Sequence, residues 1–244
     1  MKKYNFLEIL TLLTSLSELL PLIIALFFLK KIKIIYLKVF FVYLILLAFI
    51  SSIILFVVNA ENSKISYLIL LRFYIAIEYF TLILFFASLA KNQFYKKLII
   101  YSVIPFWIYC IYNYQTSNQN TFNNYPSLVE FSVLILIIIY YFFEKMKIVS
   151  TVPLFESISF WLCVGLFIYF TGNLFFLLFI NLTSDKEFIK QMFFIYSSVT
   201  ITKNIILAAA WFANEKLQTD ADIIQLPQNM KLDDDFTFTN TTNP

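Results

Sequence analysis

The chain has 244 residues, of which 61% are hydrophobic and only 14% are charged, and its formal net charge is +3. A soluble domain is typically about 25% charged, and a single soluble core stops growing at about 250–300 residues, so this composition excludes an ordinary soluble fold. The sequence contains no histidine, which excludes a Ser–His or Cys–His catalytic pair, a histidine phospho-acceptor and a histidine-ligated metal or haem.

Apolar stretches long enough to cross a membrane recur along the whole chain. A hydrocarbon core about 30 Å thick needs about 20 apolar residues in a helix, and seven segments approach or exceed this length. We therefore predict that residues 1–214 form an all-α integral membrane bundle of seven transmembrane helices. The predicted helices are Phe6–Leu29, Ile34–Val58, Tyr67–Ala90, Leu98–Tyr114, Pro126–Phe143, Glu156–Ile180 and Gln191–Asn214.

Basic residues fall unequally on the two sides of these helices. The N-terminus and the second, fourth and sixth loops between these helices hold five lysines. The first, third and fifth loops and the C-terminal tail hold eleven. Because Lys and Arg concentrate in cytoplasmic loops, we predict an external N-terminus, a cytoplasmic C-terminus and a location in the cell inner (cytoplasmic) membrane. The smaller set is Lys2, Lys3, Lys64, Lys186 and Lys190; the larger set is Lys30, Lys31, Lys33, Lys38, Lys91, Lys96, Lys97, Lys145, Lys147, Lys216 and Lys231.

The polar tail, residues 215–244, ends in a low-complexity run after Asp235. It has too few apolar residues to fold alone, so we predict a mostly disordered cytoplasmic segment. Two interpretations stay open: a solvated chain end, or a docking peptide for a cytoplasmic signalling protein. The lysine clusters flank helices and form no basic domain, so nucleic-acid binding is not expected. The apolar anchors of such a docking peptide would be Ile223, Ile224, Leu226 and Leu232.

Four charged side chains lie deep or fairly deep in the predicted helices, namely Glu18, Arg72, Glu78 and Lys203. An ionised group near the middle of the membrane costs about 2.5–3.5 kcal/mol on insertion scales. Glu18, Glu78 and Lys203 lie at a similar depth, roughly 17–20 Å from the outer ends of their helices at 1.5 Å per residue. Such charges usually face the bundle interior and pair, so we expect Lys203 to neutralise Glu18 or Glu78. The predicted polar centre, contributed by the first, third, sixth and seventh helices, comprises Glu18, Glu78, Lys203, Asn204, Thr200 and Asn173.

A second group of charges is predicted nearer the outer surface, with Arg72 facing either Glu8 or Glu130. Three interpretations of these two groups stay open. Buried ion pairs can fix helix register alone, they can form a pocket that senses a ligand or a signal, or they can form an ion or proton path. The sequence shows no catalytic pair, glycine-rich phosphate loop or metal-ligand set, so we expect no enzymatic activity, no cofactor and no metal.

Two stretches near the C-terminus carry a family resemblance. They read FWLCVGLFIYFTGNLFFLLFIN (Phe160–Asn181) and TKNIILAAAWF (Thr202–Phe212), and they resemble the last two helices of multi-span membrane input modules in sensor histidine kinases of Bacteroidetes-type bacteria. The chain departs from those sensors because no kinase domain follows the last helix. The resemblance implies a stand-alone module that senses or transmits a signal through a separate partner, such as a histidine kinase.

The seven-helix plan also resembles microbial rhodopsins, in which a lysine of the seventh helix binds retinal. That resemblance implies covalent attachment at Lys203 and a counter-ion at Glu78. Three features depart from the family: Val199 stands where an acidic residue is usual, residues 156–180 contain no proline, and Arg72 precedes Glu78 by a longer spacing. A retinal-binding protein is therefore a minor alternative, and a small-solute or proton transporter is the main alternative to signalling.

Overall fold

The computed structural model describes residues 6–59, 64–117, 124–147, 153–180 and 186–213. Within these ranges the regular structure is helical and no strand forms. Seven helical segments there are long and apolar enough to cross a membrane, so the predicted all-helical class with seven helices of membrane-spanning length is confirmed. The predicted tail, 215–244, lies outside the described residues.

The helices follow the predicted order, with small shifts at their ends. Short 3-10 turns, η1 (Leu29–Lys31) and η2 (Leu154–Glu156), come before the second and the sixth span. Apolar side chains surround most of each long helix, as expected for an element whose backbone bonds are satisfied internally in lipid. The undivided spans are α1 (Phe6–Phe27), α2 (Ile35–Asn59), α3 (Lys64–Leu89), α6 (Tyr125–Met146), α7 (Ile158–Ile180) and α8 (Lys186–Ala210).

The last span, α8, begins five residues before the predicted start because hydropathy marks the apolar centre of a helix and not its polar ends. Glu187 lies in the first turn, where the helix dipole favours an acidic side chain. Its carboxylate oxygen Oε2 lies 3.2 Å from Lys190 Nζ, three residues later. The helix ends at Ala210, and the predicted end, Asn214, lies outside the described residues.

The fourth span differs from the predicted helix Leu98–Tyr114. It is longer and consists of two helices, α4 (Gln93–Tyr101) and α5 (Val103–Thr116), which together form one apolar segment. The break at Ser102 falls three residues before Pro105. A proline lacks the N–H donor of a helical residue and its ring collides with the preceding turn, which accounts for the interruption.

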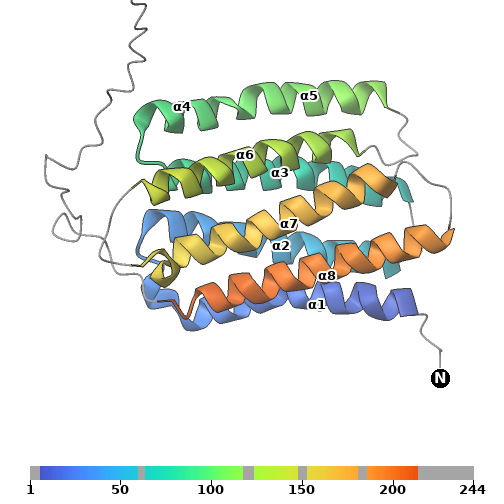
Figure 1. Cartoon of the computed structure of the whole chain (residues 1–244). Helices are drawn as coiled ribbons and strands as arrows, with labels where there is room; N and C mark the ends of the chain where they lie inside the picture. The colour runs from blue at the N-terminus through green and yellow to red at the C-terminus, as the bar shows by residue number, and fades with distance from the viewer. Residues whose placement is uncertain (1–5, 60–63, 118–123, 148–152, 181–185, 214–244) are drawn as a thin grey trace, which may run out of the picture.

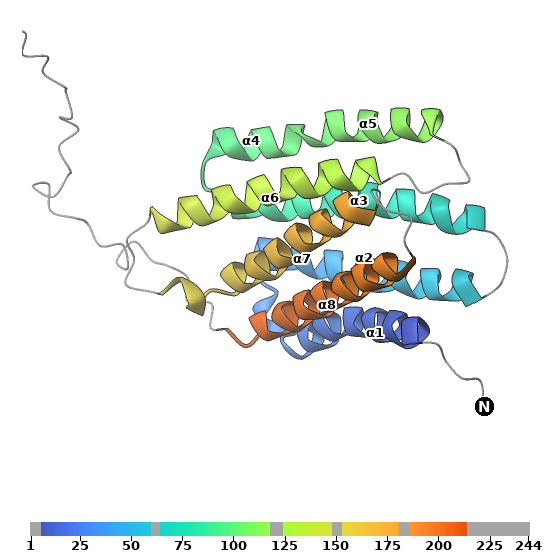
Figure 2. The ribbon, with the colours of Figure 1, turned by 45° about the vertical axis from the view of Figure 1, so that its right-hand side comes forward.

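Six of the seven spans found in the described ranges form a closed ring (Figures 1 and 2). Around the ring α1 packs on α2, α2 on α3, α3 on α6, α6 on α7, α7 on α8, and α8 on α1. The divided span α4–α5 lies outside the ring, against α3 and α6. Side chains from six helices can therefore meet inside the ring, whereas α4–α5 covers only one side of it.

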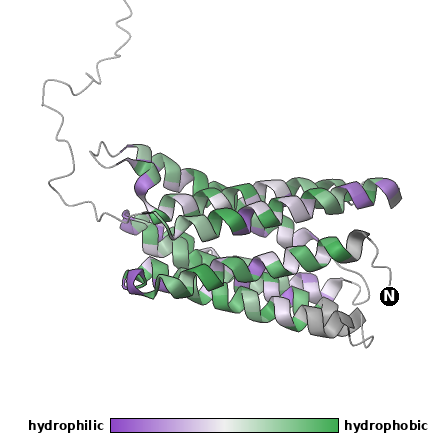
Figure 3. Cartoon of the chain, turned by 90° about the horizontal axis from the view of Figure 1, so that it is seen from below, coloured by the Kyte–Doolittle hydropathy of each residue, from purple (hydrophilic) through white to green (hydrophobic). Residues whose placement is uncertain are grey.

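Polar residues concentrate at the two ends of the bundle, and the middle of its length is mainly apolar (Figure 3). The end opposite the N-terminus contains η1, the connection between α3 and α4, the end of α6 and the end of α8. The described lysines of the larger set lie in these segments, in the turn between η1 and α2, in the first turns of α2 and in α4. The larger set of lysines, which was identified along the sequence, is therefore gathered at one end of the bundle.

One lysine at this end joins the first span to the last. Lys31 Nζ, in η1, donates to the carbonyl oxygens of Trp211 at 3.0 Å and Ala213 at 2.8 Å, just beyond α8. Phe28 packs edge-on against Phe212, with ring centroids 5.1 Å apart. Because the last carbonyls of a helix lack intrahelical partners and favour a nearby cation, Lys31 caps α8 and ties it to the end of α1.

Replacing Lys31 by methionine is expected to lower the free energy of unfolding by about 1 kcal/mol. The variant loses the cation and both hydrogen bonds but keeps an apolar stem of similar length. Unfolding in mixed detergent micelles measures the loss. Lys33→Met, at an exposed lysine two residues later, is the control and is expected to stay within about 0.5 kcal/mol of the parent. Equal losses in the two variants would contradict the capping role.

Candidate functional site

The ring holds a cluster of charged side chains that are shielded from solvent. Lys203 of α8 is 1% exposed, Glu78 of α3 is 3% exposed and Glu130 of α6 is 0% exposed. Glu18 of α1 is half-buried. A buried ionised group is costly unless it is paired and hydrogen-bonded, so the partners of these residues decide what the site can do.

Tyrosine hydroxyls and a lysine surround the carboxylate of Glu78. Tyr43 of α2 donates its hydroxyl to Glu78 Oε1 at 3.0 Å. Tyr74, one turn earlier on α3, forms a hydrogen bond to the same carboxylate. Lys203 acts on it electrostatically. Two hydroxyl donors and a nearby cation are the compensation that a buried carboxylate requires.

Lys203 lies within electrostatic range of two carboxylates, those of Glu18 and Glu78. It forms no direct salt bridge with either of them in the described part of the chain. Its Nζ lies instead 4.1 Å from the centroid of the Tyr169 ring on α7, a cation–π contact that gains strength when the cation is desolvated. The carboxylates of Glu18 and Glu78 therefore act on the Lys203 ammonium group at longer range than a salt bridge, and the group in direct contact with it is the Tyr169 ring.

Serine and asparagine side chains connect α1 to α2 and α8. Ser51 of α2 donates its hydroxyl to Glu18 Oε2. Asn204, next to Lys203 on α8, donates from Nδ2 to Ser17 Oγ at 2.8 Å. The first bond links α1 to α2 beside the charged residue of α1, and the second links α1 to α8 beside the charged residue of α8.

The structure brings four of the six predicted residues of the polar centre into these contacts. The other two, Thr200 and Asn173, are also buried. Thr200 Oγ1 donates to the carbonyl oxygen of Tyr196 on its own helix at 2.9 Å. The side-chain oxygen and nitrogen of Asn173 have no hydrogen-bond partner among the described residues. Asn173 is therefore a buried polar group whose hydrogen-bonding capacity is unused in this arrangement.

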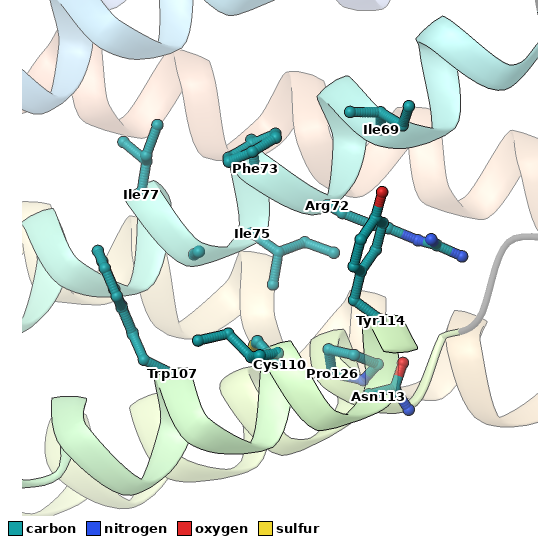
Figure 4. A pocket seen from close by; sticks show the side chains of 12 residues that line it. Ile69, Arg72, Phe73, Ile75, Ile77, Trp107, Cys110, Asn113, Tyr114 and Pro126 are labelled. Carbon is teal, nitrogen blue, oxygen red and sulfur yellow. The ribbon is translucent and has the colours of Figure 1, made fainter. Parts of the chain in front are cut away.

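The residues predicted for the outer-side cluster have different surroundings. Arg72 turns toward α5 (Figure 4), where its Nη2 donates to Ser117 Oγ at 3.3 Å and its guanidinium lies 4.9 Å from the Tyr114 ring centroid. Glu130 forms no hydrogen bond from either carboxylate oxygen to a described residue, and it lies close enough to Glu78 to interact electrostatically. The side chain of Glu8 lies outside the described residues.

Four uncharged residues of the site were missed by the sequence reasoning: Ser17 of α1, Tyr43 and Ser51 of α2, and Tyr169 of α7. With 16 tyrosines and 30 phenylalanines in the chain, aromatic content carried no signal. The available signal was spacing, because Tyr43 and Ser51 are eight residues apart and so share one broad face of a helix. Their role as partners of Glu78 and Glu18 depends on the rotation of α2, which the sequence does not show.

Close packing of α7 on α8 brings the Tyr169 ring into contact with Lys203. The two glycines of the chain, Gly165 and Gly172, both face α8: a Cβ at Gly172 would lie 2.7 Å from both methyl carbons of Val199, and one at Gly165 would lie 3.0 Å from Leu207 Cδ2. Small residues let helix backbones approach closely in a membrane. The glycines therefore set how near α7 lies to α8.

The comparisons with known proteins add no family. Neither a protein-family model nor a curated protein nor a solved structure matches this chain. Across the described ranges, no three His, Cys, Asp or Glu side chains gather in a way that could hold a metal ion. The described fold is a helical bundle with seven helices of membrane-spanning length, as is typical of multi-pass membrane proteins, and it contains a buried, hydrogen-bonded charge cluster.

Proposed function

We propose that this protein is a non-enzymatic membrane module that senses or transmits a signal and works with a separate partner, such as a histidine kinase. The observation that carries the proposal is the position of α8 in the charge cluster. Its Lys203 interacts with carboxylates of α1 and α3, and its Asn204 is hydrogen-bonded to α1. A change of charge or packing in the ring therefore acts on the helix that leads into the tail.

The proposed orientation places the N-terminus outside and the C-terminus in the cytoplasm, in the cell inner membrane. The concentration of lysines at the end where α8 finishes supports it, because basic residues accumulate on the cytoplasmic side. In this orientation residues 215–244 reach a cytoplasmic signalling protein. The resemblance of the last two helices to sensor input modules supports the same arrangement.

A signal shifts such a module only if it has different affinities for two packings of the helices. Lys203 offers a physical basis for two packings, since it interacts with Glu18 and Glu78 without a direct salt bridge to either. A small rotation of α8 would bring it nearer to one carboxylate and farther from the other. We infer that α8 is the element whose position depends on the signal.

Photocrosslinking from the tail tests the proposed partner. The full chain, carrying a photoreactive residue in place of Leu217, is expected to crosslink to a histidine kinase that mass spectrometry identifies. Glu78→Gln is expected to change that kinase's autophosphorylation by about fivefold or more, the usual lower range of allosteric coupling. Glu187→Gln, at a carboxylate that is 70% exposed, is the control and leaves it unchanged. A missing crosslink, or autophosphorylation that ignores Glu78→Gln, would contradict the proposal.

A proton or small-solute transporter is the second candidate, and Glu130 is the residue that favours it. Its carboxyl group is fully buried, has no hydrogen-bond partner among the described residues and lies near Glu78, as a relay of two carboxyl groups would require. Flux through proteoliposomes that is lost in Glu78→Gln and in Glu130→Gln would favour transport. A visible absorption band after addition of all-trans retinal, lost in Lys203→Met, would favour the retinal-binding alternative.

A further inference from the structure

A groove lies outside the six-helix ring, between α3 and α5 (Figure 4). Its volume is about 360 Å³ and its lining is mainly apolar. We call it the α3–α5 groove. The lining residues that the argument uses are Arg72, Phe73, Ala76, Trp107, Ile111 and Tyr114.

The α3–α5 groove opens on the outer face of the bundle, and the exposed side chains at its opening are apolar. Phe73 is 65% exposed, Ile111 is 56% exposed and Trp107 is 43% exposed. These residues belong to two spans that cross the membrane, and α5 lies outside the six-helix ring. In a bilayer such exposed side chains face hydrocarbon, so the occupant that fits the groove is an acyl chain.

One end of the α3–α5 groove is cationic. Arg72 lies there beside Tyr114 and Asn113, whereas Trp107 lies toward the opposite end (Figure 4). Arg72 is eight residues into α3, roughly 12 Å from its first residue at 1.5 Å per residue, so a long side chain can extend toward the headgroup layer. A guanidinium binds phosphate oxygens in a bidentate manner, which suits a phosphate group at the end of an acyl chain.

We propose that the α3–α5 groove binds one anionic phospholipid, with the lipid phosphate at Arg72 and an acyl chain running past Phe73 to Trp107. The stacking of Arg72 on the Tyr114 ring and its bond to Ser117 hold the guanidinium at the end of the groove. The polar centre inside the ring plays no part in this site. The proposal therefore stands whether the protein signals or transports.

Quenching of Trp107 fluorescence by lipids brominated along their acyl chains tests the proposal directly. The full chain is placed in phosphatidylcholine nanodiscs with increasing amounts of brominated phosphatidylglycerol or brominated phosphatidylcholine. The chain has three tryptophans, so the Trp107 signal is taken as the difference between the parent and Trp107→Phe. The anionic lipid is expected to reach half-maximal quenching at a mole fraction about fivefold lower than the zwitterionic lipid.

Three variants separate the headgroup contact from the acyl-chain contact. Arg72→Gln is expected to abolish the preference for the anionic lipid, and Arg72→Lys is expected to keep a smaller one because a lysine binds phosphate as a point charge. Ala76→Leu fills the groove and is expected to reduce quenching by both lipids. Lys97→Gln, at an exposed lysine of α4, is the charge-matched control and keeps the full preference.

Two results would overturn the site. Equal quenching of the parent by both lipids would mean ordinary contact with bulk lipid. A preference that survives in Arg72→Gln would place the phosphate elsewhere. Circular dichroism of each variant in the same nanodiscs shows whether it is folded, and Ala76→Leu, which keeps Arg72, tests the groove if Arg72→Gln does not fold.

Discussion

Lys203→Met is expected to lower the free energy of unfolding by about 3–5 kcal/mol, the usual cost of removing one partner from a buried charge group. The methionine leaves Glu18 and Glu78 without the cation that acts on both of them. It also removes the charge above the Tyr169 ring. Unfolding by sodium dodecyl sulfate in mixed micelles gives the free energy of the parent and of the variant.

Adding a carboxylate substitution to Lys203→Met shows whether the loss of stability comes from uncompensated charge. Lys203→Met combined with Glu78→Gln, or with Glu18→Gln, is expected to regain about 1–3 kcal/mol, since each combination removes a carboxylate left uncompensated. Lys190→Met, at a lysine whose side chain is 56% exposed, is the matched control and is expected to cost less than about 0.5 kcal/mol. If neither double variant is more stable than Lys203→Met, the carboxylates and the lysine are not coupled.

Gly172→Ala is expected to lower the free energy of unfolding by about 1–3 kcal/mol, the typical cost of overpacking. The new methyl group would lie 2.7 Å from both methyl carbons of Val199. Valine in a helix has one strongly preferred rotamer, so its side chain cannot turn away. The backbones of α7 and α8 must then separate, and mixed-micelle unfolding measures the cost.

Gly165→Ala provides the comparison on the same pair of helices. Its Cβ would lie 3.0 Å from Leu207 Cδ2, the flexible end of a side chain, so we expect a smaller loss than at Gly172. Adding Val199→Ala to Gly172→Ala is expected to recover part of the loss, because the shorter side chain makes room for the new methyl group. Equal losses at the two glycines, or no recovery in the double variant, would show that the Val199 contact does not set the helix spacing.

These two sets of variants also bear on signalling, since both act on α8. Lys203→Met changes the charge that α8 presents to α1 and α3, whereas Gly172→Ala changes its distance from α7. If α8 carries a signal to the tail, both should change the activity of the partner. If the activity of the partner changes with Lys203→Met but not with Gly172→Ala, the signal depends on the charge of α8 and not on its distance from α7.

The amino-acid sequence was enough to predict the helical class and a common depth for three of the buried charges. Seven apolar segments were visible because lipid requires about 20 apolar residues for each crossing. Glu18, Glu78 and Lys203 were placed at a common depth because every helical residue advances by the same 1.5 Å. Their burial in one cluster follows from the cost of leaving such charges in hydrocarbon. The break at Ser102 had a signal as well, in the nearby Pro105.

The sequence could not predict which helices meet or which way each one faces, because both depend on how the bundle packs. The ring is closed by α3 against α6 and by α8 against α1, which puts α5 outside and directs Arg72 toward it. Glu130 lies near Glu78, and Tyr43, Ser51 and Tyr169 become partners of the charges. The hydropathy of a segment indicates that it spans the membrane. It gives little information on how an apolar helix is rotated about its own axis, because most of its faces are similarly apolar. Packing between helices selects that rotation, and with it the neighbours of each buried charge.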